Sequence, residues 1–218
     1  MLNHGIRQSI KIMIVIVDYG SSNLHSVSNV LEELGEDYLV TSDPEEVRKS
    51  KKIILPGVGA IKPAYDRLSK SGLSKALHEA VICNEAYFLG ICLGMQMLFS
   101  SSEEGNNITD CLGWIKGNVV SLEGSLPYWK VPHIGWSETT TLKDIELTYK
   151  IKNNACFYYC HSFYAEGVCI ENRLMQTEFN SKSITTAVIQ DNIYGVQFHP
   201  ERSGKAGLQL IENFININ

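Results

Sequence analysis

The amino-terminal half of the chain alternates short, almost continuous apolar runs with segments of helical period, and this alternation limits the possible folds more than any other feature. The strand-sized runs are 13–18, 38–41, 52–55 and 87–91. Apolar residues recur at helical spacing over 24–34 and again over 62–84, where Gly72 interrupts the pattern. Strands that alternate with helices in this way predict a parallel sheet covered by helices on both faces.

Beyond about residue 112 the pattern changes to short strands joined by turns. The expected strands are 119–122, 157–163, 173–177, 185–189 and 193–198. Helical spacing returns only at 207–214. We therefore predict an α/β fold with an open, mixed but mainly parallel sheet, helices on both faces and a β-rich carboxy-terminal half. Residues 13–218 are expected to form a single domain, and residues 1–12 a leader that is not part of the fold.

The composition argues against several classes of function. The net charge is −5 and lysine and arginine form no run, so nucleic-acid binding is not expected. The longest apolar runs fall well short of the roughly 18 residues that a membrane helix needs. The six cysteines form no Cys-x-x-Cys pair and no cluster with zinc spacing, and the start of the chain lacks the features of a signal peptide. We expect a cytoplasmic protein with reduced thiols that needs neither a metal nor a cofactor.

The segment Gly90-Ile91-Cys92-Leu93-Gly94 follows an expected strand and opens an expected helix. Small residues on both sides of a nucleophile allow the sharp, strained turn of a nucleophile elbow. The free N–H groups and partial positive charge at the start of a helix favour the thiolate, which is the attacking species. Cys92 is thus a candidate nucleophile, and the N–H of Leu93 a candidate oxyanion donor. The alternative is a buried structural cysteine between two glycines.

A thiolate nucleophile needs a base and a group that orients the base. His199-Pro200-Glu201 follows the expected strand 193–198, and side chains two residues apart in an extended segment share a face. The carboxylate of Glu201 can therefore lie beside the imidazole of His199. Both Cys92 and His199 come at the carboxyl ends of strands, where open α/β sheets collect their chemistry.

Together these motifs resemble the class I, or triad, glutamine amidotransferases, with the finer resemblance to the glutaminase subunits of imidazole glycerol phosphate synthase. The resemblance spans about residues 13–214. It rests on Gly90-Ile91-Cys92-Leu93-Gly94-Met95-Gln96, Asp18-Tyr19-Gly20-Ser21-Ser22-Asn23-Leu24, Pro56-Gly57-Val58-Gly59, Pro132-His133-Ile134-Gly135-Trp136 and Gly195-Val196-Gln197-Phe198-His199-Pro200-Glu201.

The resemblance implies a role for each matching residue. Cys92 corresponds to the nucleophile, His199 to the base and Glu201 to its partner. The residues implied to bind the substrate are Gln96, Glu104, Tyr158, His161 and Ser162. The residues implied to form the oxyanion hole are Gly57, Val58, Gly59 and Leu93. An ordinary strand-to-helix turn is the alternative for 56–59.

The implied activity is hydrolysis of L-glutamine to glutamate and ammonia through a cysteinyl thioester. The implied partner is a (β/α)₈-barrel cyclase that forms a heterodimer with the chain. Together they would be the lyase that makes imidazole glycerol phosphate and AICAR in histidine biosynthesis. Ser137 and Arg202 depart from the asparagine and lysine that are usual in the family, and they bear on the identity of the partner.

Three alternatives stay open at this point. A paralogous glutaminase subunit could supply ammonia to a sugar amidotransferase in surface-polysaccharide biosynthesis. A triad peptidase or γ-glutamyl hydrolase on the same fold is a second, and a non-catalytic scaffolding subunit is a third. Retention of the complete Cys92, His199 and Glu201 set argues against a scaffold.

Overall fold

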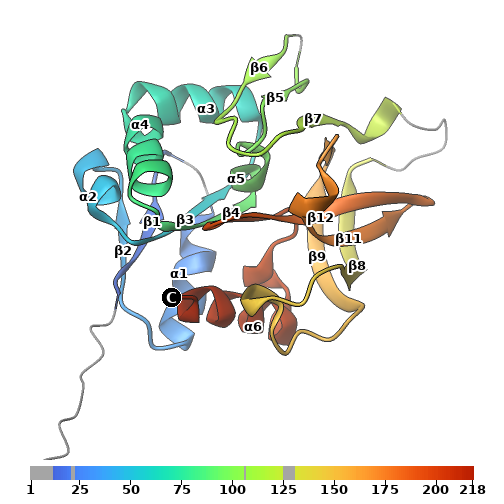
Figure 1. Ribbon diagram of the computed structural model, residues 1–218. Coiled ribbons are helices and arrows are strands. Elements are labelled where there is room, and N and C mark those ends of the chain that lie inside the picture. Colours follow the sequence, from blue (N-terminus) through green and yellow to red (C-terminus); the bar gives the residue numbers. More distant parts are fainter. Residues whose placement is uncertain (1–11, 21–22, 106, 125–130) are drawn as a thin grey trace, which may run out of the picture.

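The computed structural model describes residues 12–20, 23–105, 107–124 and 131–218, and the expected leader lies outside this part of the chain except for Ile12. The described residues fold around one mixed sheet (Figure 1). Its main path runs β2-β1-β3-β4-β13-β12-β10-β7-β5-β6, and β11, β8 and β9 branch from β12. The predicted fold class, a mixed α/β sheet, is confirmed.

Five strands form the parallel half of the sheet. In spatial order they are β2 (Tyr38–Thr41), β1 (Ile14–Val17), β3 (Lys52–Gly57), β4 (Tyr87–Cys92) and β13 (Ile193–Val196). Side chains alternate between the two faces: Val15 and Val17 of β1 enter one hydrophobic cluster, and Ile14 and Ile16 enter the other. Because both faces of the inner strands are covered, β1, β4 and β13 are mostly apolar, which explains why they were visible in the sequence.

Helices cover the two faces separately (Figure 1). One face packs against α2 (Pro44–Lys49), α3 (Ile61–Lys70), α4 (Leu73–His78) and α5 (Leu93–Gln96), and the other against α1 (Leu24–Glu33) and α6 (Gly204–Asn216). The break predicted at Gly72 is present, since this glycine has φ +80° between α3 and α4. A π-helical turn, η1 (Glu79–Cys83), follows α4.

The other half of the sheet is built around β12 (Lys182–Gln190), whose pairings are all antiparallel, and only β5 and β7 pair in parallel there. One branch holds β10 (Phe163–Glu166), β7 (Asn118–Ser121), β5 (Ser101–Ser102) and β6 (Thr109–Asp110); the other holds β11 (Arg173–Phe179), β8 (His133–Thr141) and β9 (Ala155–His161). The strand predicted at 157–163 is two strands, because the chain turns at Ser162. The sequence did not predict β8, whose inward positions include the polar residues His133 and Thr139 while Ile134 and Trp136 are exposed.

The carboxyl ends of three parallel strands meet at one edge of the sheet. Gly57, the last residue of β3, pairs with Cys92, the last residue of β4, and Val196 of β13 pairs with Ile91. The segments that begin at Val58, Leu93 and Gln197 therefore leave the sheet side by side. This edge is where the sequence places its chemistry.

Candidate active site

Cys92 sits on the sharp turn that the sequence predicted between a strand and a helix. Its backbone has φ 54° and ψ −105°, outside the regions that side chains prefer. A Cβ added to Gly90 would lie 2.6 Å from the carbonyl oxygen of Gly94, and one added to Gly94 would lie 1.9 Å from the carbonyl oxygen of Leu55. Only glycine fits at either position, so the motif is a packing requirement of the turn.

His199 and Glu201 are hydrogen-bonded at this edge. The Nδ1–H of His199 donates to Oε1 of Glu201 at 2.8 Å, and both side chains are almost completely buried. The backbone is extended only at His199, because Glu201 lies in a short 3₁₀ turn, η5 (Pro200–Arg202). The side chain of Asn23 also donates to Oε1 of Glu201.

Ser203 and β9 fix the backbone of His199. The hydroxyl of Ser203 donates to the carbonyl of His199 at 2.6 Å and accepts the backbone N–H of Tyr158 at 3.0 Å. The N–H of His199 donates to the carbonyl of Tyr158 at 2.9 Å. The imidazole is therefore held in place by backbone contacts as well as by Glu201.

The surroundings of His199 favour its charged form. Burial lowers its pKa, but hydrogen bonds to the side chains of Cys92 and Glu201 outweigh burial and raise the pKa to about 10. The imidazolium at neutral pH is then paired with Cys92 on one side and Glu201 on the other. A histidine in this position can accept the proton of the neighbouring thiol and return it.

A cavity of about 320 Å³ opens in front of Cys92 and His199. Its lining residues are Val58, Gly59, Cys92, Leu93, Gln96, Glu104, Pro132, Cys160, His161, Ser162, Phe163, His199 and Arg202. Nine of these are among the twelve predicted site residues. Glu201 lies behind His199, and Gly57 and Tyr158 also lie outside the lining.

Gln96 and Glu104 form part of the cavity wall. The NH₂ group of Gln96 lies 3.1 Å from the carbonyl oxygen of Phe163 and 3.1 Å from Oε1 of Gln197, which leaves the amide oxygen of Gln96 for another partner. The carboxylate of Glu104 accepts the backbone N–H of Ile61 at 2.7 Å. Burial raises the pKa of Glu104, and the bond from Ile61 partly offsets this effect.

His161 lines the cavity, but both of its ring nitrogens are already engaged. Nδ1 lies 2.8 Å from the carbonyl oxygen of Phe163, and Nε2 lies 3.1 Å from Nδ1 of His133. Burial lowers the pKa of His161 to about 3 and that of His133 to about 4, so both rings are neutral. The ring of His161 therefore forms a wall of the cavity, and Ser162 is the neighbouring residue with a free polar side chain there.

The segment predicted to form the oxyanion hole lies at the end of β3. Gly57 packs closely against Tyr19, because a Cβ added to Gly57 would lie 2.1 Å from the hydroxyl oxygen of Tyr19. Gly59 has φ +96° and open space around its Cα, a combination that permits rotation of the neighbouring peptide. Val58 and Gly59 face the cavity together with Leu93.

Sequence reasoning gave no role in the site to Asn23, which it took as a candidate helix cap, or to Gln197, yet both contact the site. Each was quoted within a family motif, but neither residue type is itself diagnostic of catalysis. A glutamine within an apolar strand, two residues before His199, was the available signal for Gln197, since buried polar side chains need partners.

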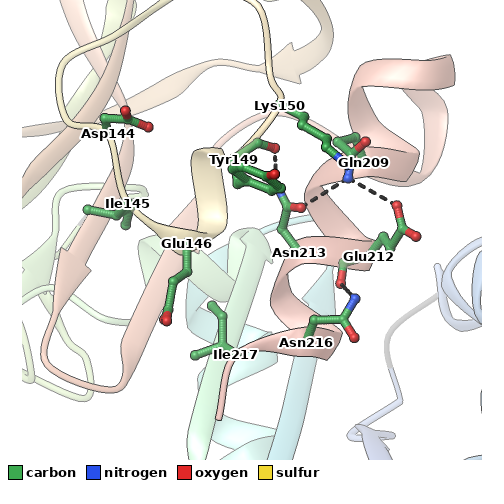
Figure 2. Close-up of a pocket in the computed structure, with 10 residues that line it drawn as sticks. All are labelled: Asp144, Ile145, Glu146, Tyr149, Lys150, Gln209, Glu212, Asn213, Asn216 and Ile217. Atoms are coloured by element: carbon green, nitrogen blue, oxygen red, sulfur yellow. Dashed lines mark hydrogen bonds between the residues drawn. The ribbon is translucent and has the colours of Figure 1, made fainter.

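A larger hollow, of about 490 Å³, lies away from this edge, between α6 and the turn η3 (Glu146–Thr148). Figure 2 shows that Asn213 and Gln209 are tied into hydrogen bonds there: Asn213 donates to the carbonyl of Tyr149 at 2.7 Å, and Gln209 donates to Asn213 and Glu212. None of the predicted site residues lines it. The bond from Asn213 attaches α6 to the loop between β8 and β9, so we place the chemistry in the smaller cavity.

The described residues hold neither a metal cluster nor a membrane-spanning helix. No group of three or more histidine, cysteine, aspartate or glutamate side chains there is placed to hold a metal ion. None of the helices in the same part of the chain is long and apolar enough to cross a membrane.

A cysteine on a strand-turn-helix elbow lies next to a histidine and glutamate pair at the carboxyl edge of a doubly covered sheet. This is the arrangement expected of an α/β enzyme of the triad type. The chain belongs to the family described as glutamine amidotransferase class-I, which it matches over residues 15–217.

Close relatives in sequence carry a more specific name. The chain is 42% identical over 203 residues to imidazole glycerol phosphate synthase subunit HisH 2 of Methanococcus maripaludis, which covers 93% of this chain and 98% of the relative. It is 38% identical over 205 residues to subunit HisH 1 of Campylobacter jejuni, with 94% and 100% covered. Among solved structures, PurLQS from Thermotoga maritima superposes with a TM-score of 0.71 at 18% identity, covering 95% of this chain and 99% of the other. That likeness supports the fold.

Proposed function

We propose that this chain is the glutaminase subunit of imidazole glycerol phosphate synthase, with Cys92, His199 and Glu201 as its catalytic triad. The observation that carries the proposal is the cavity in which Cys92 and His199 meet Gln96 and Glu104. The names of relatives that match the chain over more than nine-tenths of its length support the synthase.

In the first half of the reaction, the thiolate of Cys92 attacks the side-chain amide carbon of glutamine. Backbone N–H groups of Leu93 and of residues 57–59 stabilise the oxyanion that forms. The imidazolium of His199 gives its proton to the amide nitrogen, the carbon–nitrogen bond breaks, and ammonia leaves a γ-glutamyl thioester on Cys92. The raised pKa of His199 supports this role, because the proton is in place before the leaving group needs it.

In the second half, the now neutral imidazole of His199 takes a proton from water. The resulting hydroxide attacks the thioester, glutamate leaves, and the proton returns the site to the thiolate–imidazolium pair. Glu201 keeps the Nδ1–H of His199 directed toward itself, so Nε2 faces the reacting atoms in both halves. Gln96, Glu104, Tyr158, His161 and Ser162 are the residues we propose for the glutamine site.

The proposed partner is a (β/α)₈-barrel cyclase that forms a heterodimer with the chain in the cytoplasm. Ammonia released into bulk water would be protonated, so direct transfer is the economical design. The edge of the cavity offers an apolar docking surface: Ile134 and Trp136 on β8 are 59% and 57% exposed, and Ile134 pairs with Cys160, which lines the cavity. The assembled enzyme would make imidazole glycerol phosphate and AICAR in histidine biosynthesis.

Two experiments test the proposal. Glutamate release should disappear in Cys92→Ala and persist in Cys83→Ala, which removes an exposed thiol outside the cavity. Normal turnover by the Cys92→Ala protein would overturn the glutaminase assignment. Co-purification should recover a barrel cyclase; recovery of an ATP-dependent sugar amidotransferase instead would move the chain to surface-polysaccharide biosynthesis.

A further inference from the structure

Gln197 is completely buried, and its side chain reaches the sulfur of Cys92. Its Nε2 lies 3.6 Å from Sγ, a normal distance for an N–H···S hydrogen bond. The backbone N–H of Gln197 donates to the carbonyl of Thr186 at 2.8 Å, which anchors the residue just beyond β13. The mechanism described above does not use this contact.

The neighbours of Gln197 determine which end of its amide faces the sulfur. The carbonyl oxygen of Phe163 can only accept, so Gln96, 3.1 Å away, must present its NH₂ group. The same NH₂ group lies 3.1 Å from the Gln197 amide and has only hydrogens to offer. The amide oxygen of Gln197 therefore faces Gln96. This orientation leaves the NH₂ group of Gln197 facing Cys92.

A pair of neutral histidines fixes the start of this chain of hydrogen bonds. His161 donates Nδ1–H to the carbonyl of Phe163 at 2.8 Å, and its Nε2 accepts from Nδ1–H of His133 at 3.1 Å. Nε2 of His133 lies 2.8 Å from the hydroxyl of Ser137, which donates to it. Burial keeps the pKa values of both histidines well below 6.5, so each ring carries one hydrogen in one defined place.

We infer that Gln197 is a catalytic residue of this site, whose amide N–H donates to the thiolate of Cys92 and holds its sulfur for attack, with Gln96 as the residue that orients it. A hydrogen bond from an amide to an ionised acceptor is stronger than one between neutral groups, so this contact favours the thiolate. The inference rests on the proposed role of Cys92 as nucleophile. In this arrangement the sulfur of Cys92 has two donors, His199 and Gln197.

The direct test is alkylation of Cys92, which needs neither glutamine nor a partner. Gln197→Met keeps the length of the side chain and removes its donor. We expect iodoacetamide to alkylate Cys92 at mildly acidic pH about tenfold more slowly in this variant, the effect of losing a hydrogen bond to a charged group. Mass spectrometry of the peptide that contains Cys92 gives the rate, and exposed Cys83 is a reference thiol within the same molecule.

The same cavity contains other groups whose charge changes with pH, so variants are compared with the wild type at each pH. The titratable or charged side chains that share it with Cys92 are Glu104, Cys160, His161, His199 and Arg202. Gln190→Met is the matched control, because Gln190 also donates from a partly buried amide, to the carbonyl of Trp114 at 2.9 Å, at the end of β12 away from Cys92. Its rate should equal that of the wild type.

Gln96→Met tests the orienting role separately from substrate binding. We expect a loss of several-fold in the alkylation rate, and the double variant should be no slower than Gln197→Met alone, because Gln96 acts through Gln197. A folded Gln197→Met protein with the wild-type rate overturns the inference. If Gln197→Met does not fold, a wild-type rate in Gln96→Met overturns it. Glutaminase activity in Cys92→Ala would refute the proposed nucleophile and leave the alkylation result standing.

Discussion

Asn23 donates its side-chain amide to Oε1 of Glu201, the same carboxylate oxygen that accepts the Nδ1–H of His199. Asn23 precedes α1 but makes no capping bond to it, although asparagine is a favoured capping residue. Its side chain is instead used to hold Glu201. A segment near the amino terminus thereby contacts the hydrogen-bonded pair His199 and Glu201 near the carboxy terminus.

We expect Asn23→Ala to lower kcat for glutamine hydrolysis about tenfold with little change in KM, because Glu201 would lose one of the donors that fix its position. Steady-state kinetics measure the effect. Asp43→Ala is the control: Asp43 caps α2 by accepting the N–H of Glu45 at 2.9 Å, so it should cost about 1 kcal/mol of stability and leave kcat unchanged. In a Glu201→Ala background, Asn23→Ala should lower kcat little further. If Asn23→Ala lowers kcat equally in the wild-type and the Glu201→Ala backgrounds, it does not act through Glu201.

The neutral pair His133 and His161 should make the fold sensitive to acid. Their folded pKa values, about 4 and about 3, lie below the ordinary value of 6.5. Below pH 6.5 the unfolded chain binds protons that the folded chain does not, so this stability is complete above pH 6.5 and declines as the pH falls toward 4. Each histidine contributes a slope of about 1.4 kcal/mol per pH unit to the free energy of unfolding.

His133→Asn removes one of these titrations while keeping an amide donor near His161. Urea unfolding at a series of pH values between about 7 and 5 should show a slope smaller by about one proton. The exposed residue His78, at the end of α4, provides the control variant His78→Asn, measured over the same pH values. An unchanged slope in His133→Asn would show that the pair is protonated in the folded protein.

Gly94 should tolerate no side chain, because a Cβ would lie 1.9 Å from the carbonyl oxygen of Leu55 in the neighbouring strand. We expect Gly94→Ala to cost about 3 kcal/mol or more, or to prevent folding. Gly35→Ala is the comparison: Gly35 has φ +69°, and a Cβ added there would have no neighbouring atom within 4 Å, so only backbone strain of about 1 kcal/mol applies. Thermal unfolding of both variants measures the difference, and similar melting temperatures would count against the close packing at the elbow.

Trp136 should matter for the proposed partner and not for the free chain. Trp136 is 57% exposed. Among the described residues, its one aromatic contact is edge-on with Tyr158, with the ring centroids 6.0 Å apart. We expect Trp136→Ala to weaken binding of the cyclase by tenfold or more while changing stability by less than about 0.5 kcal/mol. Ile170→Ala is the control, because Ile170 is 76% exposed and lies near the end of β12 that holds Ile189. Calorimetry should find that this variant binds the cyclase as tightly as the wild type.

The elbow at Cys92 and the proximity of His199 to Glu201 were predictable because both depend on local sequence. Glycine at positions 90 and 94, and two side chains separated by Pro200, determine these geometries within a few residues. The apolar runs predicted the parallel strands for the same reason, since burial on both faces leaves an uninterrupted signal. The sequence by itself therefore determined the fold class and the candidate triad.

The tertiary structure alone decided which buried polar groups meet. Asn23 reaches Glu201 across 178 positions of sequence, and Gln197 reaches Cys92 across 105. β8 was invisible because its inward side chains, His133 among them, are polar and find their partners on β9. Hydrogen bonds between distant residues leave no periodic pattern in a sequence, because only the register of the sheet brings the donor to its acceptor.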